Sequence, residues 1–280
     1  MLGRRPRVSG SLHRFLEDQL SWEGGVRMPA GEKKVAVLAQ FSESAQMSRS
    51  VTELIRELNR NGYYVVMSSA CIDPAPLRWR GEAPERVAVL RKPNVGYDFG
   101  SWAVAFAAEP RILDAEHLIV INDSMLGPFW SLEHVIQHFE GSDGDVWGLT
   151  QTHQVIPHLQ SYFLGFHRSV IESPVFADLW SQVRVEPTKT DVIFRYELGF
   201  ARSLYVEGFV SRAFAGGQVL ARFGENPSVL GWRRLLELGV PLIKREIVTS
   251  RGNNAEQFMH NDRIPKILER EYGIDIADWL

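Results

Sequence analysis

The feature that most constrains this chain is a short apolar run that stops abruptly at three polar residues. Leu118 to Ile121 is unbroken, apolar and rich in β-branched side chains. Such a run is typical of a strand buried on both faces, as in a parallel sheet covered by helices. Asn122, Asp123 and Ser124 follow at once. Polar residues at the carboxyl end of a buried strand lie where open α/β sheets bind ligands, although the same residues also satisfy turn and cap hydrogen bonds.

Strands and helices are expected to alternate around this run. The expected strands are 35–41, 63–69, 86–90, 118–121, 146–149, 159–166, 211–222 and 241–248. The expected helices are 48–59, 98–108, 133–139, 171–180, 196–208, 229–238 and 264–272. This order predicts an α/β fold in which helices flank a mainly parallel, Rossmann-like sheet.

The length of 280 residues suits one large domain. We expect residues 33–280 to form a single α/β domain, and residues 1–32 to be an N-terminal extension or linker. Arginines are frequent in that extension, at positions 4, 5, 7, 14 and 27. A solvated tail is the first expectation for it, and peripheral contact with an anionic membrane surface is the alternative.

Composition and motifs exclude several classes of protein. With 31 basic and 34 acidic residues, the chain is not a nucleic-acid binder that relies on bulk positive charge. A single cysteine, Cys71, rules out an internal disulfide and a cysteine-rich metal site. No apolar run approaches the roughly 18 residues that span a bilayer, and no secretory signal is present, so we expect a cytoplasmic protein. The common hydrolase, zinc-protease and dinucleotide-binding motifs are absent.

What remains is a set of polar residues at the expected strand ends. Its members are Asp98, Asn122, Asp123, Ser124, Gln160, Glu197 and Lys244. A loop with Asn94 and Gly96 precedes Asp98, and its glycines permit the close backbone approach that a phosphate or sugar needs. A nucleotide-sugar transferase needs positive charge for the departing diphosphate and, if it inverts, a base for the acceptor hydroxyl. This set of residues supplies both.

Five short motifs resemble one family in identity and order. They are Asn94-Val-Gly-Tyr-Asp98, Asn122-Asp-Ser-Met-Leu-Gly-Pro128, Gln160-Ser-Tyr-Phe163, Tyr196-Glu197 and Pro241-Leu-Ile-Lys244. Together they resemble the rhamnan synthesis F family, glycosyltransferases of bacterial surface polysaccharide assembly, over roughly residues 33 to 250. The resemblance implies a GT-A-like fold with a nucleotide sugar at the strand ends. It also implies a dTDP-, UDP- or GDP-linked donor such as dTDP-rhamnose. The acceptor would be a glycan or lipid-linked glycan at the inner face of the cell membrane.

The resemblance also assigns roles. GT-A enzymes place an Asp-x-Asp metal motif where this chain has Asn122-Asp123-Ser124, so Asp123 is the expected ligand of Mg²⁺ or Mn²⁺, and transfer without a metal is the alternative. Lys244 would neutralise phosphate charge, Asp98 would contact donor hydroxyls, and Gln160 would contact a sugar. Glu197 is the expected catalytic base because it opens a helix, and Asp98 is the second residue expected to be catalytic. Asn94, Gly96, Asn122 and Ser124 complete the expected donor site.

Two other functions are consistent with the residues. One is a non-catalytic module that binds a sugar or nucleotide sugar, which the single carboxylate at positions 122–124 favours. The other is a hydrolase or phosphotransferase centred on Asp98 or Asp123. Dependence of product formation on a glycan acceptor separates all three.

Overall fold

The computed structural model describes residue 8, residues 10–249 and residues 263–280. Its strands are β1 (Ser21–Trp22), β2 (Lys34–Gln40), β3 (Tyr64–Ser69), β4 (Val87–Arg91), β5 (His117–Asn122), β6 (Met125–Leu126), β7 (Val146–Thr152), β8 (His158–Leu159), β9 (Phe163–His167), β10 (Ser211–Ala215) and β11 (Ile243–Lys244). Its α-helices are α1 (Ser11–Leu16), α2 (Arg49–Arg60), α3 (Tyr97–Ala108), α4 (Glu133–Glu140), α5 (Arg168–Ile171), α6 (Pro174–Ser181), α7 (Lys189–Val192), α8 (Leu198–Val206), α9 (Gly217–Leu220), α10 (Pro227–Leu230), α11 (Trp232–Glu237), α12 (Glu246–Thr249) and α13 (Ile264–Tyr272).

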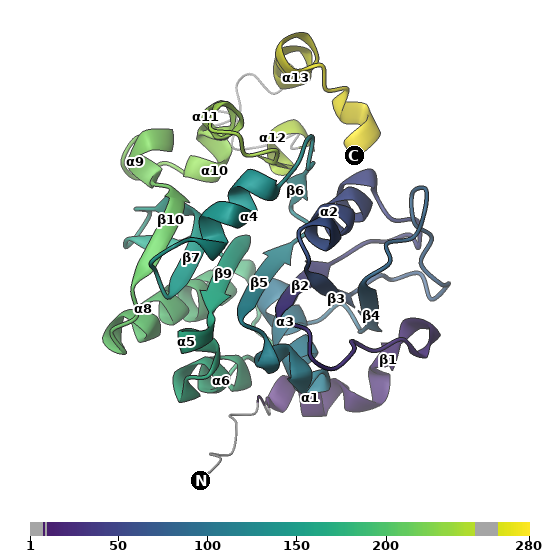
Figure 1. Cartoon of the computed structure of the whole chain (residues 1–280). Coiled ribbons are helices and arrows are strands. Elements are labelled where there is room, and N and C mark those ends of the chain that lie inside the picture. The colour runs from purple at the N-terminus through teal and green to yellow at the C-terminus, as the bar shows by residue number, and fades with distance from the viewer. Residues whose placement is uncertain (1–7, 9, 250–262) are drawn as a thin grey trace.

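The strands form a large central sheet with helices on both faces (Figure 1). The order across the sheet is β1-β4-β3-β2-β5-β9-β7-β10, and β8 pairs with β7. Neighbours from β4 to β5 are parallel, as are β7 and β10, whereas β9 is antiparallel to both β5 and β7. The expected fold class, a mainly parallel α/β sheet flanked by helices, is confirmed.

Alternation along the central strands divides the core between the two faces of the sheet. In β2, Val35 and Val37 pack in the cluster that contains α3 and α6, while Ala36 and Leu38 pack in the cluster that contains α2 and α4. All four side chains are fully buried. Because successive side chains point to opposite faces, a strand covered on both sides must be apolar throughout. This is the reason that the unbroken apolar runs mark the centre of the sheet.

A third apolar cluster supports a two-stranded ribbon beside the main sheet. β6 pairs antiparallel with β11, so that Lys244 lies opposite Met125. Leu126 and Ile243 from this ribbon pack with Leu268 of α13 and with Trp279 near the C-terminus. Only two residues separate the end of β5 from the ribbon, which therefore fixes Lys244 next to the carboxyl end of the central strand.

The described part of the N-terminal segment packs on the core. Leu12 and Leu16 of α1, together with Met28, are buried in the cluster that contains α3. β1 pairs with the edge strand β4, which places Trp22 opposite Leu90. This part of the segment is thus attached to the domain rather than solvated. The arginines at positions 4, 5 and 7 lie outside the described residues, and peripheral membrane contact through them stays a prediction.

Several element boundaries differ from those expected. The expected strand 241–248 is only the two residues of β11, because Arg245 donates its backbone N–H to Ser124 and α12 starts at Glu246. The expected strand 211–222 ends at Ala215 and is followed by α9. The expected helix 196–208 begins earlier: α7, a π-helical turn over Ile193–Glu197 and α8 are continuous. Glu197 therefore does not open a helix, and that reason for assigning it as the base is wrong.

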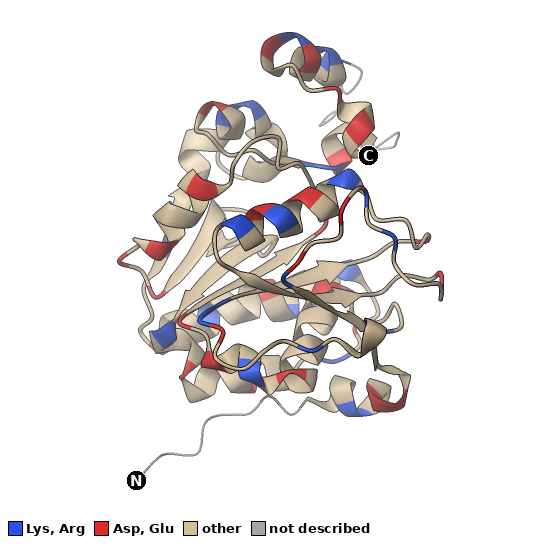
Figure 2. Ribbon diagram, turned by 45° about the vertical axis from the view of Figure 1, so that its right-hand side comes forward, with Lys and Arg blue, Asp and Glu red and all other residues tan. Residues whose placement is uncertain are grey.

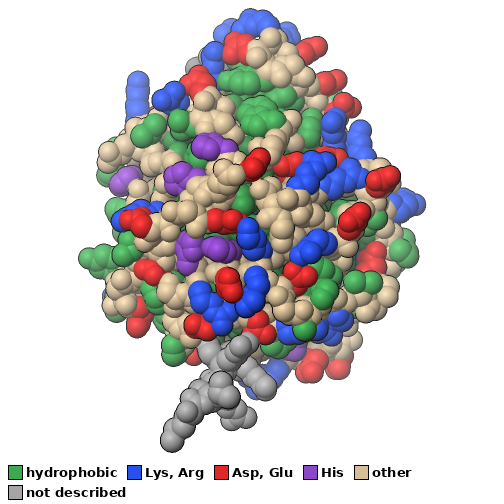
Figure 3. All heavy atoms as spheres, viewed as in Figure 1, with side chains coloured by type: hydrophobic (Ala, Val, Ile, Leu, Met, Phe, Trp, Pro, Cys, Tyr) green, Lys and Arg blue, Asp and Glu red, His purple; other side chains and the backbone are tan. Residues whose placement is uncertain are grey.

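Charged residues are spread over the outer helices and loops, while the strands carry few of them (Figure 2). On the face shown in Figure 3, acidic and basic side chains are interspersed and no patch of one sign dominates. This distribution agrees with the formal net charge of −3. Within the described residues, none of the helices combines the length and the apolar character needed to cross a bilayer.

Candidate active site

Most of the predicted site residues line one cavity at the carboxyl end of β5. This polar cavity has a volume of about 400 Å³. The predicted residues that line it are Asp98, Asn122, Ser124, Gln160, Glu197 and Lys244. They come from β5 and the turn after it, from the start of α3, from the segment between β8 and β9, from the π-helical turn and from β11. The topology thus gathers residues that are up to 146 positions apart in the sequence, from Asp98 to Lys244.

Asp98 and Asn122 form the floor of the polar cavity. Nδ2 of Asn122 donates to Oδ2 of Asp98 at 2.8 Å, and Oδ1 of Asn122 accepts from the hydroxyl of Ser124 at 2.6 Å. Burial raises the pKa of Asp98, and the hydrogen bond from Asn122 opposes that shift. A carboxyl group with a raised pKa is closer to the pKa that suits a general base at neutral pH.

Lys244 brings a positive charge to the cavity. Its Nζ lies 3.4 Å from Oγ of Ser124 and 4.7 Å from the centre of the Tyr162 ring. Among the described residues, no carboxylate lies within ion-pair distance of it, and burial lowers its pKa. An ammonium group that contacts a hydroxyl and an aromatic face, and that forms no ion pair with a carboxylate, can bind an anionic ligand.

Glu197 is held by three donors. Its Oε1 lies 3.0 Å from Nε2 of His158, and its Oε2 accepts from the backbone N–H of Ser161 at 3.1 Å and from the Ser161 hydroxyl. Nδ1 of His158 lies 2.8 Å from the carbonyl oxygen of Ile156. Since a carbonyl oxygen only accepts, Nδ1 carries a proton. Burial opposes both charges, but these hydrogen bonds outweigh it, raising the pKa of His158 and lowering that of Glu197. Both shifts favour the form of the pair in which His158 is an imidazolium and Glu197 a carboxylate.

Gln160 is fixed in a chain of hydrogen bonds. Its Oε1 accepts from the Thr150 hydroxyl at 2.7 Å, and its Nε2 donates to Oδ1 of Asn226 at 3.0 Å. Asn226 in turn caps α10 by accepting from the backbone N–H of Ser228. The amide of Gln160 is thus oriented before any ligand binds, which lowers the entropic cost of a contact with a sugar.

The predicted residues Asn94 and Gly96 do not line the polar cavity. Gly96 has a φ of +87°, and a Cβ there would lie 3.0 Å from both Gly100 and Leu12. Its role in the structure is therefore to let the chain turn into α3. The buried ammonium of Lys92 holds this loop from beneath, donating to the carbonyl oxygens of Pro93 at 2.7 Å and Val95 at 2.9 Å.

Asp123 also points away from the polar cavity. Its Oδ2 accepts from the backbone N–H of Phe41 at 2.9 Å, at the end of the neighbouring strand β2. No group of three or more His, Cys, Asp or Glu side chains that could hold a metal ion occurs among the described residues. These side chains therefore do not fit a metal held by protein ligands alone. Binding of Mg²⁺ or Mn²⁺ through Asp123 stays a prediction.

We expect Asp123→Asn to stabilise the protein at neutral and alkaline pH. Burial raises the pKa of Asp123 to about 6, so the folded state holds its proton more tightly than the unfolded state does. Ionisation therefore costs stability, a cost that is complete above pH 6 and absent below about pH 4. The variant should gain about 2 to 3 kcal/mol at pH 8 and nothing at pH 3.5, because one pKa unit corresponds to about 1.4 kcal/mol. Urea unfolding at both pH values measures this.

The control for this prediction is Asp143→Asn. Asp143 is exposed, and the hydrogen bond from Arg212 lowers its pKa, so its ionisation favours the folded state instead. That variant should show no gain at pH 8. An Asp123→Asn variant without a gain would mean that the carboxylate is solvated or paired. A carboxylate retained at a cost to stability is a candidate functional group.

Sequence reasoning missed several residues of the polar cavity. His158, Ser161, Tyr162, Lys189 and Asn226 all line it. Ser161 and Tyr162 belong to the motif that starts at Gln160, so their position was available as a signal. His158 had no such signal, because its partner Glu197 is 39 positions away.

Comparison with known proteins identifies one family. The family model of rhamnan synthesis protein F matches residues 86–276, more than half of the chain. Virulence protein VirA of Vibrio anguillarum is 23% identical over 252 residues, which cover 78% of this chain and 80% of that protein. Uncharacterized protein y4gN of Sinorhizobium fredii is 28% identical over 155 residues. That match covers 53% of this chain but only 40% of the relative's length.

Among solved structures, the chain is similar to a glycosyltransferase involved in the glycosylation of the major capsid of PBCV-1. The two are 14% identical, and the TM-score is 0.41. The superposition covers 81% of this chain and 99% of the other.

Proposed function

Because this chain belongs to the rhamnan synthesis protein F family, we propose that it is a glycosyltransferase of polysaccharide synthesis. The proposed donor is a nucleoside-diphosphate sugar, with rhamnose as the first candidate sugar and dTDP, UDP or GDP as the nucleotide. The proposed acceptor is a growing glycan or lipid-linked glycan. The observation that carries the proposal is the polar cavity, where the ammonium of Lys244 faces Asp98 and Asn122 without a carboxylate partner among the described residues.

The cavity supplies the charges that sugar transfer needs. When the bond between the sugar and the diphosphate breaks, negative charge develops on the leaving phosphate. We propose that Lys244 neutralises it, and Lys189 also lines the cavity. Since the ammonium group of Lys244 is held by Ser124 and Tyr162 before the reaction, it would stabilise this charge without reorganisation of solvent. The amides of Asn122 and Gln160 are held by Asp98 and Asn226, and we propose that the second N–H of each contacts a sugar hydroxyl.

Of the two carboxylates predicted to be catalytic, we propose Asp98 as the proton acceptor in an inverting reaction. Burial raises the pKa of Asp98, whereas the donors around Glu197 lower its pKa and make it a weaker base. Glu197 would then position Ser161 and His158. An Asp98→Asn variant should bind nucleotide like the wild type but transfer sugar about 100-fold more slowly. Transfer at the wild-type rate would overturn the assignment of Asp98.

We expect Lys244→Met to weaken binding of the donor nucleotide at least about tenfold, because it removes the charge that pairs with phosphate. The measurement is thermal unfolding with dTDP, UDP and GDP, each with and without Mg²⁺ or Mn²⁺. A nucleotide at 100 times its Kd adds about 2.7 kcal/mol of stability, which shifts the midpoint by a few degrees. The nucleotide that shifts the wild type identifies the donor class.

Lys33→Met is the matched control, because Lys33 is exposed and pairs with Glu116 away from the polar cavity. It should keep the full shift. If no nucleotide stabilises the wild type, the transferase proposal fails. A shift without acceptor-dependent turnover would indicate the non-catalytic binding module. Release of phosphate from simple esters without an acceptor would indicate a hydrolase.

A further inference from the structure

A second cavity lies directly beside the polar cavity and is lined mainly by apolar side chains. It has a volume of about 420 Å³, similar to that of the polar cavity. We call it the apolar cavity. The apolar side chains that line it are Phe99, Val146, Ile156, Pro157, Leu159, Leu164, Phe200, Ala201, Leu204 and Tyr205. They come mainly from β7, β8, β9 and α8, on the face of the sheet that α3 and α6 also cover.

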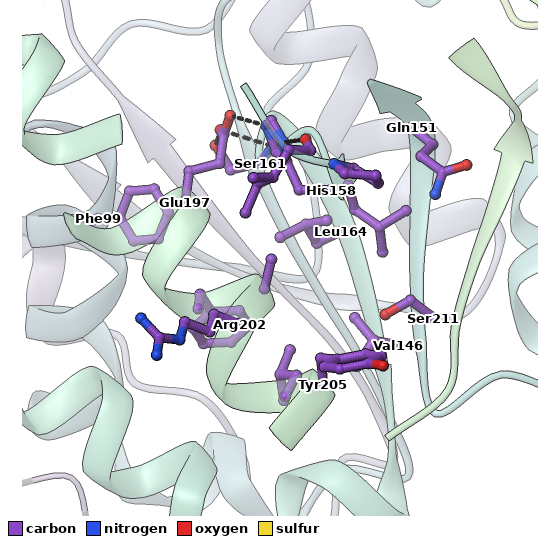
Figure 4. Close-up of a pocket in the computed structure, with 16 residues that line it drawn as sticks. Phe99, Val146, Gln151, His158, Ser161, Leu164, Glu197, Arg202, Tyr205 and Ser211 are labelled. Carbon is purple, nitrogen blue, oxygen red and sulfur yellow. Dashed lines mark hydrogen bonds and ion pairs between the residues drawn. The ribbon is translucent and has the colours of Figure 1, made fainter. Parts of the chain in front are cut away.

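The two cavities share one wall. Phe99, His158, Ser161 and Glu197 line both of them. Figure 4 shows Glu197, Ser161 and His158 together at one end of the apolar cavity, with Val146, Tyr205 and Ser211 toward the other end. The hydrogen-bonded group around Glu197 is therefore the boundary between a polar space and an apolar one.

The polar groups of the apolar cavity lie only at its edges. At the shared wall they are Glu197, His158 and Ser161, and elsewhere they are Gln151 together with the exposed residues Arg202 and Ser211. The space between them offers few hydrogen-bonding groups, so a sugar ring would lose its contacts with water there without replacement. A ligand that fits must have an apolar body and a polar end at the shared wall.

The apolar surface continues outside the cavity. Tyr205, which lines it, is 81% exposed, and Ile156 is 40% exposed. Val155, which lines the polar cavity, is 71% exposed. Exposed apolar side chains around the opening of a cavity are typical of sites that bind apolar ligands. An apolar chain longer than the cavity would still contact these exposed side chains where it extends beyond the opening.

We propose that the apolar cavity binds an apolar group attached to the acceptor sugar, such as an alkyl chain, while that sugar lies at the wall formed by Glu197, His158 and Ser161. The proposal rests on the proposed function, since it names the chemical class of the acceptor. The donor occupies the polar cavity, the acceptor hydroxyl is presented across the shared wall, and the apolar group anchors the acceptor. This arrangement explains why an apolar space of this size adjoins a charged one.

The test compares two acceptor analogues, n-octyl β-D-glucopyranoside below its micelle concentration and methyl β-D-glucopyranoside. The wild type should bind the octyl compound at least about tenfold more tightly, as measured by titration calorimetry. Ala201→Phe, a change at a partly exposed position of α8 that lines the cavity, should remove this difference. Binding of the two glycosides with equal affinity to the wild type, or failure of both to bind, would overturn the proposal.

The matched control is Val206→Phe, on the same helix. Val206 is 71% exposed and does not line the apolar cavity, so its variant adds the same bulk elsewhere and should keep the preference. Equal loss in both variants would overturn the proposal. The nucleotide shift is measured on the same proteins. If no nucleotide stabilises the wild type but the octyl glycoside still binds more tightly, the proposed function fails and the apolar binding site stands. If a nucleotide stabilises the wild type but both glycosides bind equally, the proposed function stands and the apolar acceptor fails.

Discussion

Gly127→Ala should destabilise the protein by about 3 to 5 kcal/mol and reduce nucleotide binding, because two penalties add at this position. Gly127 has a φ of +107°, which side chains of L-residues rarely adopt. A Cβ there would also lie 2.2 Å from the carbonyl oxygen of Pro241. That oxygen accepts from the backbone N–H of Phe129, and Pro241 lies two positions before β11 of the β6–β11 ribbon. Relief of the clash must displace the ribbon that carries Lys244.

Gly208→Ala separates the two penalties. Gly208 has a φ of +82°, but no atom lies within 4 Å of the point that a Cβ would occupy, so only the backbone penalty of about 1 to 2 kcal/mol applies. Urea unfolding gives both differences, and the nucleotide shift shows whether Lys244 has moved. If the two variants were equally stable, the close approach of Gly127 to Pro241 would be absent in solution. If Gly127→Ala bound nucleotide normally, the ribbon would not be what positions Lys244.

The central strands were predictable because their signal is local. Buried residues from Val35 to Ala39 and from Leu118 to Ile121 are apolar without interruption, and only a strand covered on both faces requires this pattern over so few residues. α2 was predictable for a similar reason: Ser48 caps it and its apolar residues recur at helical spacing. In each case, neighbours in the sequence carry the information.

The elements whose bounds were predicted wrongly depend on partners that are distant in the sequence. Residues 241–248 contain enough apolar residues for a strand, but β11 pairs only with the two residues of β6, and the chain then turns into α12. Residues 189–206 form one continuous helical segment with a π-helical turn, and nothing in the local pattern announces that turn. Single π-helical turns are often found at functional sites, where they redirect a side chain. Here the turn ends at Glu197.

The same distinction holds for the site. Asp98 and Asn122 could be grouped in advance because Asp98 follows β4 and Asn122 ends β5, and the strands from β4 to β5 run parallel and end at one edge of the sheet. Lys244 lies on β11 of the antiparallel ribbon, so this rule does not account for its position. The direction of a side chain could not be predicted in this way. Asp123 follows Asn122 in the sequence, yet its carboxylate turns to the backbone of Phe41 instead of the cavity. His158 was missed altogether, since its importance comes from Glu197 and not from its own neighbours.

Glu197→Gln should cost about 3 kcal/mol or more at pH 6, because removing one charge of a buried pair leaves the other without its partner. The side chains of His158 and Glu197 are 4% and 16% exposed. Because its pKa is raised in the folded state, His158 stabilises the fold below pH 6.5, its ordinary pKa. This stabilisation is lost as the pH rises through the pKa of the folded state. Because its pKa is lowered in the folded state, Glu197 stabilises the fold above pH 4.5, its ordinary pKa. This stabilisation is lost as the pH falls through the pKa of the folded state. The cost should thus be largest between about pH 5 and 6.5 and smaller on either side.

Glu172→Gln is the matched control for this prediction. Glu172 pairs with Arg168 one helical turn away, and it is 56% exposed, so its loss should cost at most about 0.5 kcal/mol at any pH. Nitrogen NMR of the histidine rings gives an independent readout: His158 should carry protons on both ring nitrogens at pH 6.5 and lose one in the Glu197→Gln variant. A neutral His158 ring in the wild type, or a cost that does not change with pH, would show that the wall between the two cavities is uncharged. The proposed donor and acceptor spaces would then be separated by shape alone, without the charged pair that the two pKa shifts favour.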